Sequence, residues 1–176
     1  TEGKQDVDYV LTTTEVTRMI QEAGIDLSRI EPEALDMPFG LSSGAGAIFG
    51  VTGGVTEAVL RRLKNNSSSE VLDAISFTGI RGVDGIKEAS VDLNGREVKI
   101  AVVNGLHCAK ELLDRMKDGE VHYDFVEVMA CKRGCIAGGG QPVPIGPRTK
   151  KARLEGIYKI DSMAQIKLSN ENPIVA

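Results

Sequence analysis

The sequence has 176 residues, of which 41% are hydrophobic and 26% are charged, an ordinary composition for a globular protein. A net charge of −4 argues against a nucleic-acid-binding surface, and no apolar run is long enough to predict a membrane-spanning helix. Three cysteines, an odd number, argue against a disulfide framework. We therefore expect one cytoplasmic domain over residues 1–176, without a nucleic-acid or membrane partner.

The first predicted elements are a strand at residues 8–11 and a helix at residues 13–23. Thr12 and Glu15 have the spacing of a capping box, in which each side chain bonds the backbone N–H group of the other residue. The apolar residues that follow share one helical face: Val16, Met19, Ile20 and Ala23.

A glycine-rich stretch at residues 44–54 precedes a second predicted helix at 54–64. The apolar residues of this helix lie on one face, and four charged residues lie off that face: Glu57, Arg61, Arg62 and Lys64. The glycines do not match the phosphate-loop or dinucleotide-binding patterns. Two interpretations stay open, close packing of the backbone or a backbone wall against a bound group.

The middle of the chain predicts a sheet. Residues 75–80 form a candidate strand, and residues 89–93 and 98–103 flank Asn94-Gly95, a strong hairpin signal. A helix at 105–117 and a strand at 125–129 follow. Strands that alternate with helices predict an α/β fold, here a three-layer sandwich with a mainly parallel sheet and a hairpin strand at its edge.

A basic run, residues 148–153, begins the last predicted helix, which continues to about Asp161. The simplest interpretation places these cationic side chains in solvent on the first turns of the helix.

Cys131 and Cys135 follow the strand at 125–129 and precede three consecutive glycines, Gly138, Gly139 and Gly140. Thiolates are the usual ligands of iron–sulfur clusters, and glycines let a bulky group approach the backbone. Ligands of such sheets bind beyond the carboxyl ends of strands, which is where this segment falls. The pattern favours an iron–sulfur site.

Three alternatives to an iron–sulfur site stay open at this point. The two cysteines could be an inert buried pair, they could form a disulfide, or they could bind zinc together with Cys108, His107 or His122. We interpret Cys108 as a structural residue of its helix, and both histidines as surface or capping residues.

Two stretches resemble the iron-only (FeFe) hydrogenases. Residues 43–55, SGAGAIFGVTGGV, with Glu57-Ala58 after them, are similar to one segment of that family. Residues 125–142, which include both cysteines and the glycines, resemble its third cysteine motif. The resemblance extends over nearly the whole chain.

The resemblance implies an H-cluster, in which a 4Fe-4S cubane joins a diiron subcluster, and an activity that reversibly reduces protons to hydrogen. Cys131 would bind the cubane, and Cys135 would bind it and bridge to the diiron unit. Met129 and Phe49 would form walls of the diiron pocket, and the glycines at 138–140 would line the cluster.

The sequence departs from the family pattern in two ways. The two earlier cysteine motifs of the family are absent, and Lys132 and Arg133 stand between the cysteines. The chain therefore resembles the C-terminal lobe of the active-site domain, as a fragment without the first lobe. We expect this lobe alone to be without cofactor and inactive.

The expected partners are the missing N-terminal lobe, and either ferredoxin or a nicotinamide-linked redox subunit. An isolated lobe would also expose an apolar cleft face around Phe49, Ile136 and Met129, through which two copies could form a homodimer. Two other functions stay open. One is a hydrogenase-like iron–sulfur protein without turnover, such as a redox or hydrogen sensor or an assembly relative, and the other is a zinc-stabilised domain.

Overall fold

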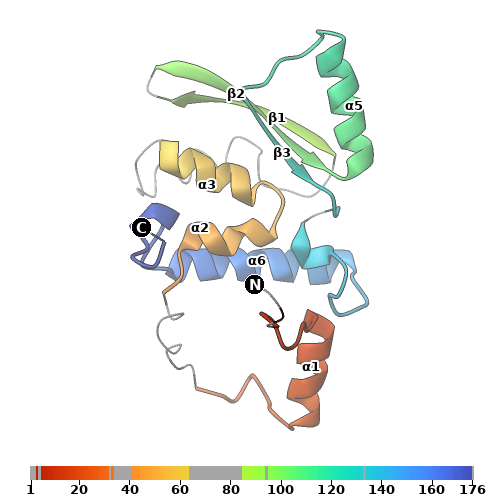
Figure 1. Cartoon of the computed structure of the whole chain (residues 1–176), viewed down its shortest axis with the longest axis vertical. Coiled ribbons are helices and arrows are strands. Elements are labelled where there is room, and N and C mark those ends of the chain that lie inside the picture. The colour runs from red at the N-terminus through yellow and green to blue at the C-terminus, as the bar shows by residue number, and fades with distance from the viewer. Residues whose placement is uncertain are drawn as a thin grey trace.

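The structure is a computed structural model that describes residues 3, 5–31, 33, 41–63, 85–93, 95–132 and 134–175 (Figure 1). The strand expected at 75–80 lies outside the described residues, as do Asn94 of the hairpin turn and Arg133 of the cysteine segment.

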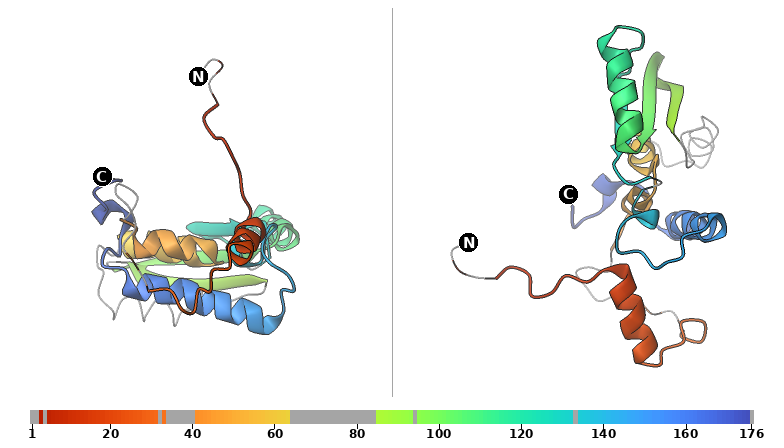
Figure 2. Two further views of the ribbon diagram at one scale, coloured as in Figure 1. Left: turned by 90° about the horizontal axis from the view of Figure 1, so that it is seen from below. Right: turned by 90° about the vertical axis from the view of Figure 1, so that its right-hand side faces the viewer.

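Helix α1 (Thr13–Glu22) begins as the sequence predicts. The Thr12 side chain accepts from the backbone N–H of Glu15, and the Glu15 carboxylate accepts from the backbone N–H of Thr12 at 2.7 Å. The strand expected just before it is wrong. Residues 8–11 form no strand, and Tyr9 and Val10 are both 86% exposed, because no other described strand lies beside this segment. Figure 2 shows the segment projecting from the body of the molecule.

The described sheet has three strands in the order β1 (Ile86–Leu93), β2 (Arg96–Asn104) and β3 (Phe125–Met129). β1 and β2 form the predicted hairpin and are antiparallel, whereas β2 and β3 are parallel. The sheet is therefore mixed, and the expectation of a mainly parallel sheet is wrong for the described strands. The described sheet has two strand pairings, and one of them is the antiparallel hairpin of β1 and β2.

Helices cover both faces of this sheet, and the alternation of β2 explains how. Ile100 and Val102 point toward α3 (Gly54–Leu63) and pack with Leu60. The residues between and after them, Ala101 and Val103, point the other way and pack against α5 (Leu106–Lys117). Successive side chains of a strand face opposite sides, so an apolar run such as this one fits a strand buried on both faces. The result is a helix–sheet–helix arrangement.

Two further helices extend the molecule beyond α3. Helix α6 (Pro147–Met163) runs beneath the short helix α2 (Gly44–Ala47), as Figure 1 shows. The two helices approach closely at Gly44, where a β-carbon would lie 2.0 Å from the Asp161 Oδ1 atom. α1 lies at the end of the molecule opposite the sheet (Figures 1 and 2). In the described part of the chain, no helix combines the length and the apolar character that a membrane crossing requires.

Candidate functional site

The two cysteines lie on the loop that follows β3. Both are exposed and free, and Cys135 begins a short 3₁₀ helix, Cys135–Ala137. The structure thus contradicts an inert buried pair, and it contains no disulfide between them. Because β2 and β3 are parallel, this loop lies at the carboxyl ends of both strands, where the backbone N–H of Gly105 donates to the carbonyl oxygen of Met129 at 2.7 Å.

The cysteine loop packs directly on the glycine-rich stretch that precedes α3. Gly134 has a φ of +79°, and a β-carbon there would lie 2.8 Å from the Gly50 carbonyl oxygen and 2.9 Å from the Thr52 nitrogen. Only glycine fits a position that needs both this backbone conformation and this contact. Of the two interpretations left open above, close packing of the backbone is confirmed for the stretch at 44–54, which forms the floor under the cysteine loop, and a backbone wall against a bound group stays a prediction.

The three glycines after the cysteines have different surroundings. Gly138 lies under the Cys131 thiol, since a β-carbon on it would be 3.4 Å from the Cys131 Sγ atom. Gly139 faces open space. Gly140 packs against Thr12, and its carbonyl oxygen accepts from the backbone N–H of Thr14 at 2.9 Å, so it anchors the start of α1. Thus Gly138 adds no side chain beside the Cys131 thiol and Gly139 is open to solvent, whereas Gly140 has a contact within the chain.

Arg153 of α6 holds the cysteine loop from the other side. Its guanidinium donates to the carbonyl oxygens of Ile136 at 2.7 Å and of Pro142 at 2.8 Å. The sequence interpretation placed the whole basic run in solvent, which is wrong for Arg153. Its side chain is half-buried because it donates to two loop carbonyl groups. These groups have no partner in a strand or helix and therefore need another donor.

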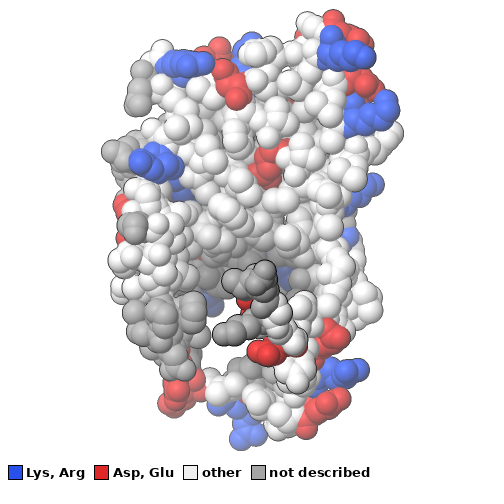
Figure 3. All heavy atoms as spheres, in the orientation of Figure 1, with Lys and Arg blue, Asp and Glu red and all other residues white. Residues whose placement is uncertain are grey.

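A cavity of about 480 Å³ lies beside Cys135, between the start of α1 and the helix α6. Its walls include Gly50, Ile136, Pro142, Arg153 and Ile157. Figure 3 shows a hollow between these two helices, on a face whose charged side chains lie mainly toward the ends and edges.

Two residues predicted as pocket walls have different positions. Met129 is half-buried at the end of β3, two residues before Cys131. Phe49 is 46% exposed and lines a separate, largely apolar cavity of about 430 Å³ with Ala58, Leu63 and Leu168. The structure therefore does not bring Phe49 into the cavity of Cys135, although its neighbour Gly50 lies there.

Glu127 is a residue of the site that the sequence interpretation missed. It lies in β3 and is 6% exposed. Its carboxylate accepts from the backbone N–H groups of Gly53 at 2.6 Å and Thr56 at 2.7 Å, and from the Thr56 hydroxyl at 2.8 Å. One acid within the apolar strand sequence FVEVM was the only available signal.

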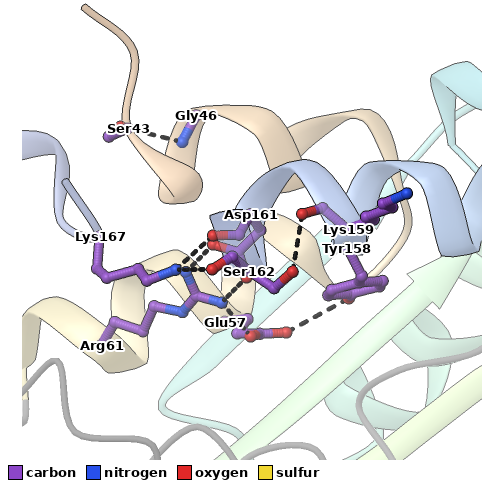
Figure 4. A network of polar contacts seen from close by, with 9 residues as sticks. All are labelled: Ser43, Gly46, Glu57, Arg61, Tyr158, Lys159, Asp161, Ser162 and Lys167. Carbon is purple, nitrogen blue, oxygen red and sulfur yellow. Dashed lines mark hydrogen bonds and ion pairs between the residues drawn. The ribbon is translucent and has the colours of Figure 1, made fainter. Parts of the chain in front are cut away.

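A buried ion network joins α3 to α6 below the glycine-rich stretch (Figure 4). Arg61 donates to both carboxylate oxygens of Asp161 at 2.8 Å and to Glu57 at 2.5 Å, and Tyr158 donates to the other oxygen of Glu57. Glu57 and Arg61 are fully buried, so their predicted place on the solvent side of the helix is wrong. Pairing with one another allows these charged groups to be buried.

The pKa of Arg61 reflects the same balance. Burial alone would lower it, but the hydrogen bonds and charges of Asp161 and Glu57 outweigh burial and raise the pKa above its ordinary value. Arg61 therefore stays cationic at any pH at which the protein is folded.

The remaining candidate ligands lie elsewhere. Cys108 packs against the buried core between α5 and the sheet, as its structural interpretation predicts, and His107 and His122 are exposed. Within the described ranges, no three His, Cys, Asp or Glu side chains come close enough together to bind a metal ion. The chemistry of Cys131 and Cys135, two free and exposed thiols on one loop, fits a group that takes thiolate ligands, as an iron–sulfur cluster does.

These features define an α/β domain with an exposed pair of thiols at the carboxyl ends of parallel strands. The family model "Iron only hydrogenase large subunit, C-terminal domain" matches residues 1–139, and the chain belongs to this family. It is 42% identical over 180 residues to "Iron hydrogenase 1" of Clostridium pasteurianum, and 45% identical over 167 residues to the periplasmic [Fe] hydrogenase large subunit of Nitratidesulfovibrio vulgaris. These matches cover 97% and 92% of the chain.

The family also includes proteins with other names. The chain is 30% identical over 162 residues to "Protein NAR1" of Arabidopsis thaliana, a match that covers 89% of the chain and 33% of that protein. Among solved structures, the apo [FeFe]-hydrogenase HydA1 of Chlamydomonas reinhardtii, variant C377H, has a TM-score of 0.64 and 33% sequence identity.

The chain is shorter than these relatives. It spans 31% and 40% of the lengths of the two hydrogenases. The match to the algal structure covers 96% of this chain and 49% of the algal chain.

Proposed function

We propose that this chain is the H-cluster-binding lobe of an iron-only hydrogenase, whose whole protein reversibly oxidises hydrogen and reduces protons. One observation carries the proposal. Two free, exposed thiols on one loop lie over a floor of glycine backbone, the environment that a large inorganic cluster needs. Membership of the hydrogenase family supports the same assignment.

In this proposal, Cys131 and Cys135 would hold the cluster through their thiolates. When bound, the cluster supplies the exchange of electrons with protons and hydrogen. The other residues position it. Gly138 leaves space beside the Cys131 thiol, and Arg153 fixes the backbone of the loop at Ile136. Met129, half-buried two residues before Cys131, would supply apolar surface beside the cluster, whereas Phe49 lines a separate cavity.

Two more cysteine ligands of the cubane come from outside this lobe. A cubane takes four thiolates. The third cysteine of this chain, Cys108, packs against the hydrophobic core between α5 and the sheet. We infer that an N-terminal lobe of the same protein supplies the missing pair and covers the cysteine loop. The chain alone would then hold no stable cluster and show no activity.

Anaerobic reconstitution with iron and sulfide tests this proposal, read by metal analysis and by electron paramagnetic resonance after reduction. We expect a cubane only when the N-terminal lobe of a hydrogenase is supplied. Cys131→Ser and Cys135→Ser should each abolish it, and the matched control Cys108→Ser should retain it. A cluster that forms equally well in Cys131→Ser would contradict the proposal.

A second candidate function is a hydrogenase-like iron–sulfur protein without turnover. The observation that favours it is Lys132, an exposed cation directly beside a proposed ligand, where the hydrogenases it resembles often have small residues. Relatives include proteins named as cytosolic Fe-S cluster assembly factors, one of them 32% identical over 160 residues. A reconstituted cluster that exchanges electrons with a dye but neither consumes nor produces hydrogen would support this candidate over the first.

The electron partner in this proposal is ferredoxin or a nicotinamide-linked subunit. A second copy of the lobe is a further partner when the first lobe is absent. The expected apolar cleft face needs one correction, because Ile136 is only 7% exposed and contributes little to it. The cytoplasmic location stays a prediction, since relatives include a periplasmic hydrogenase and cytosolic assembly factors.

A further inference from the structure

We propose that Glu127 is a positioning residue that sets the geometry of the Cys131–Cys135 pair. The proposal deepens the function above and rests on it for the identity of the bound group. Its physical basis is a buried carboxylate that accepts from the backbone N–H of Gly53, directly in front of α3, and of Thr56, in the first turn of α3.

The start of α3 needs an acceptor that its own sequence does not provide. The first N–H groups of a helix have no partner within the helix, and a side chain just before the helix commonly accepts from them. The residue at that place is Gly53, which has no side chain. Gly54 after it is equally restricted, since a β-carbon there would lie 1.7 Å from the Ile48 carbonyl oxygen. The carboxylate of Glu127 accepts hydrogen bonds from the N–H groups at this helix start in place of an N-cap side chain.

This cap comes from β3, the strand that leads into the cysteine loop. Glu127 lies four residues before Cys131, and its bonds to Gly53 and Thr56 fix β3 against the turn at 50–53. The same turn receives Gly134, which lies between the two cysteines. The turn is therefore held to the cysteine segment at two points, one before and one between the thiols. Moving either point changes the separation and direction of the two sulfur atoms.

The carboxylate is specific for this task. It accepts three hydrogen bonds, two from backbone N–H groups that cannot turn away. Glutamine has nearly the same shape, but its amide nitrogen donates and would face one of these N–H groups. Glu127→Gln therefore leaves a buried donor unpaired and loosens the turn, without adding bulk.

Phenylarsine oxide provides a probe that needs no iron. It bridges two close thiols with two arsenic–sulfur bonds, while its oxygen leaves as water with the two thiol protons and no atom is oxidised or reduced. In a Cys108→Ala background, only Cys131 and Cys135 are available. We expect Glu127→Gln to weaken binding by about tenfold or more, and Thr56→Ser, which retains the hydroxyl donor, to bind like the parent.

A control separates positioning from loss of stability. Leu112 is buried in α5 on the opposite face of the sheet, so Leu112→Ala lowers the thermal midpoint without touching the cysteine segment. It should retain the parent's affinity for phenylarsine oxide, measured well below its midpoint. Glu127→Gln with unchanged affinity, or Leu112→Ala with an equal loss, would overturn the proposal. Because the probe contains no iron, a failed cluster reconstitution would leave this result standing, and the two proposals are tested separately.

Discussion

Gly134 and Gly50 meet backbone to backbone, and a β-carbon on Gly134 would lie 2.8 Å from the carbonyl oxygen of Gly50. They are 84 residues apart in the sequence, and their contact joins the two glycine-rich segments. The cysteine loop thus has its shape because Gly134 has no side chain that would push it away from the backbone of residues 50–52.

Replacing Gly134 with alanine tests this contact. The backbone of Gly134, with φ +79° and ψ −168°, lies in a region that only glycine readily adopts, so a β-carbon there costs about 1–3 kcal/mol, and the clash adds to it. We expect Gly134→Ala to lower the free energy of unfolding by at least this amount in urea titrations. The control is Gly139→Ala, which meets nothing within 4 Å and should change stability by less than about 0.5 kcal/mol. Equal stability of the two variants would show that the loop shifts freely away from Gly50.

The buried network around Arg61 leads to a second prediction. Arg61→Met leaves the carboxylates of Glu57 and Asp161 buried without their cation, which costs about 3–5 kcal/mol for a buried pair. Thermal unfolding followed by circular dichroism should show a large drop in midpoint. Arg18→Met, which removes an exposed pair with Glu22 on α1, should leave the midpoint nearly unchanged.

Arg153 provides a third prediction, about local rather than global stability. A hydrogen bond from a charged group contributes about 1.5–3 kcal/mol, and about 1.4 kcal/mol corresponds to a tenfold change. Arg153→Met should therefore speed hydrogen exchange of amides in residues 134–142 by about tenfold or more. Amides of β2 should keep their rates. Lys151→Met, from the same basic run but paired with the exposed Glu155, is the matched control. Unchanged exchange in Arg153→Met would show that its two bonds do not hold the loop.

The pH dependence of stability has a contribution from Asp124, at the start of β3. The backbone N–H of Lys99, and to a lesser extent the charge of Arg96, lower the pKa of this carboxyl. A lowered folded-state pKa gives stability that is present above the ordinary value of 3.8 and is lost as pH falls through the folded-state pKa. Urea midpoints measured from pH 5 down to pH 2.5 should therefore fall further for the parent than for Asp124→Asn. Parallel curves would contradict this.

The elements that the sequence predicts well depend on neighbours in the chain. The capping box of α1 joins two residues three positions apart, and the hairpin between β1 and β2 turns at Gly95. The position of the cysteine segment was equally accessible, because it directly follows the predicted strand at 125–129, which is β3. Local spacing therefore predicts that these elements exist, whereas their bounds differ, since β1 begins at Ile86 and not at residue 89.

The parts that sequence reasoning missed depend on partners far along the chain. Arg61 has the spacing of a solvent-facing residue on α3, and only Asp161, 100 residues later, makes its burial favourable. The strand expected at 8–11 has the right residue types, but no described strand pairs with it. The hydrophobic periodicity and the composition of a segment describe one helix or strand at a time. The burial of a charged side chain and the pairing of a strand each depend on a second element elsewhere in the chain.

The cap on α3 also bears on the order of folding. Glu127 follows Thr56 by 71 residues, so during synthesis α3 emerges long before the carboxylate that completes its first turn. Contacts of such wide separation form slowly, because a long loop must close first. The turn under the cysteines therefore matures only when β3 joins the sheet, and the thiols become a defined pair at that late step. Under the proposed function, iron delivered to the chain before then would meet two separate thiols rather than a site.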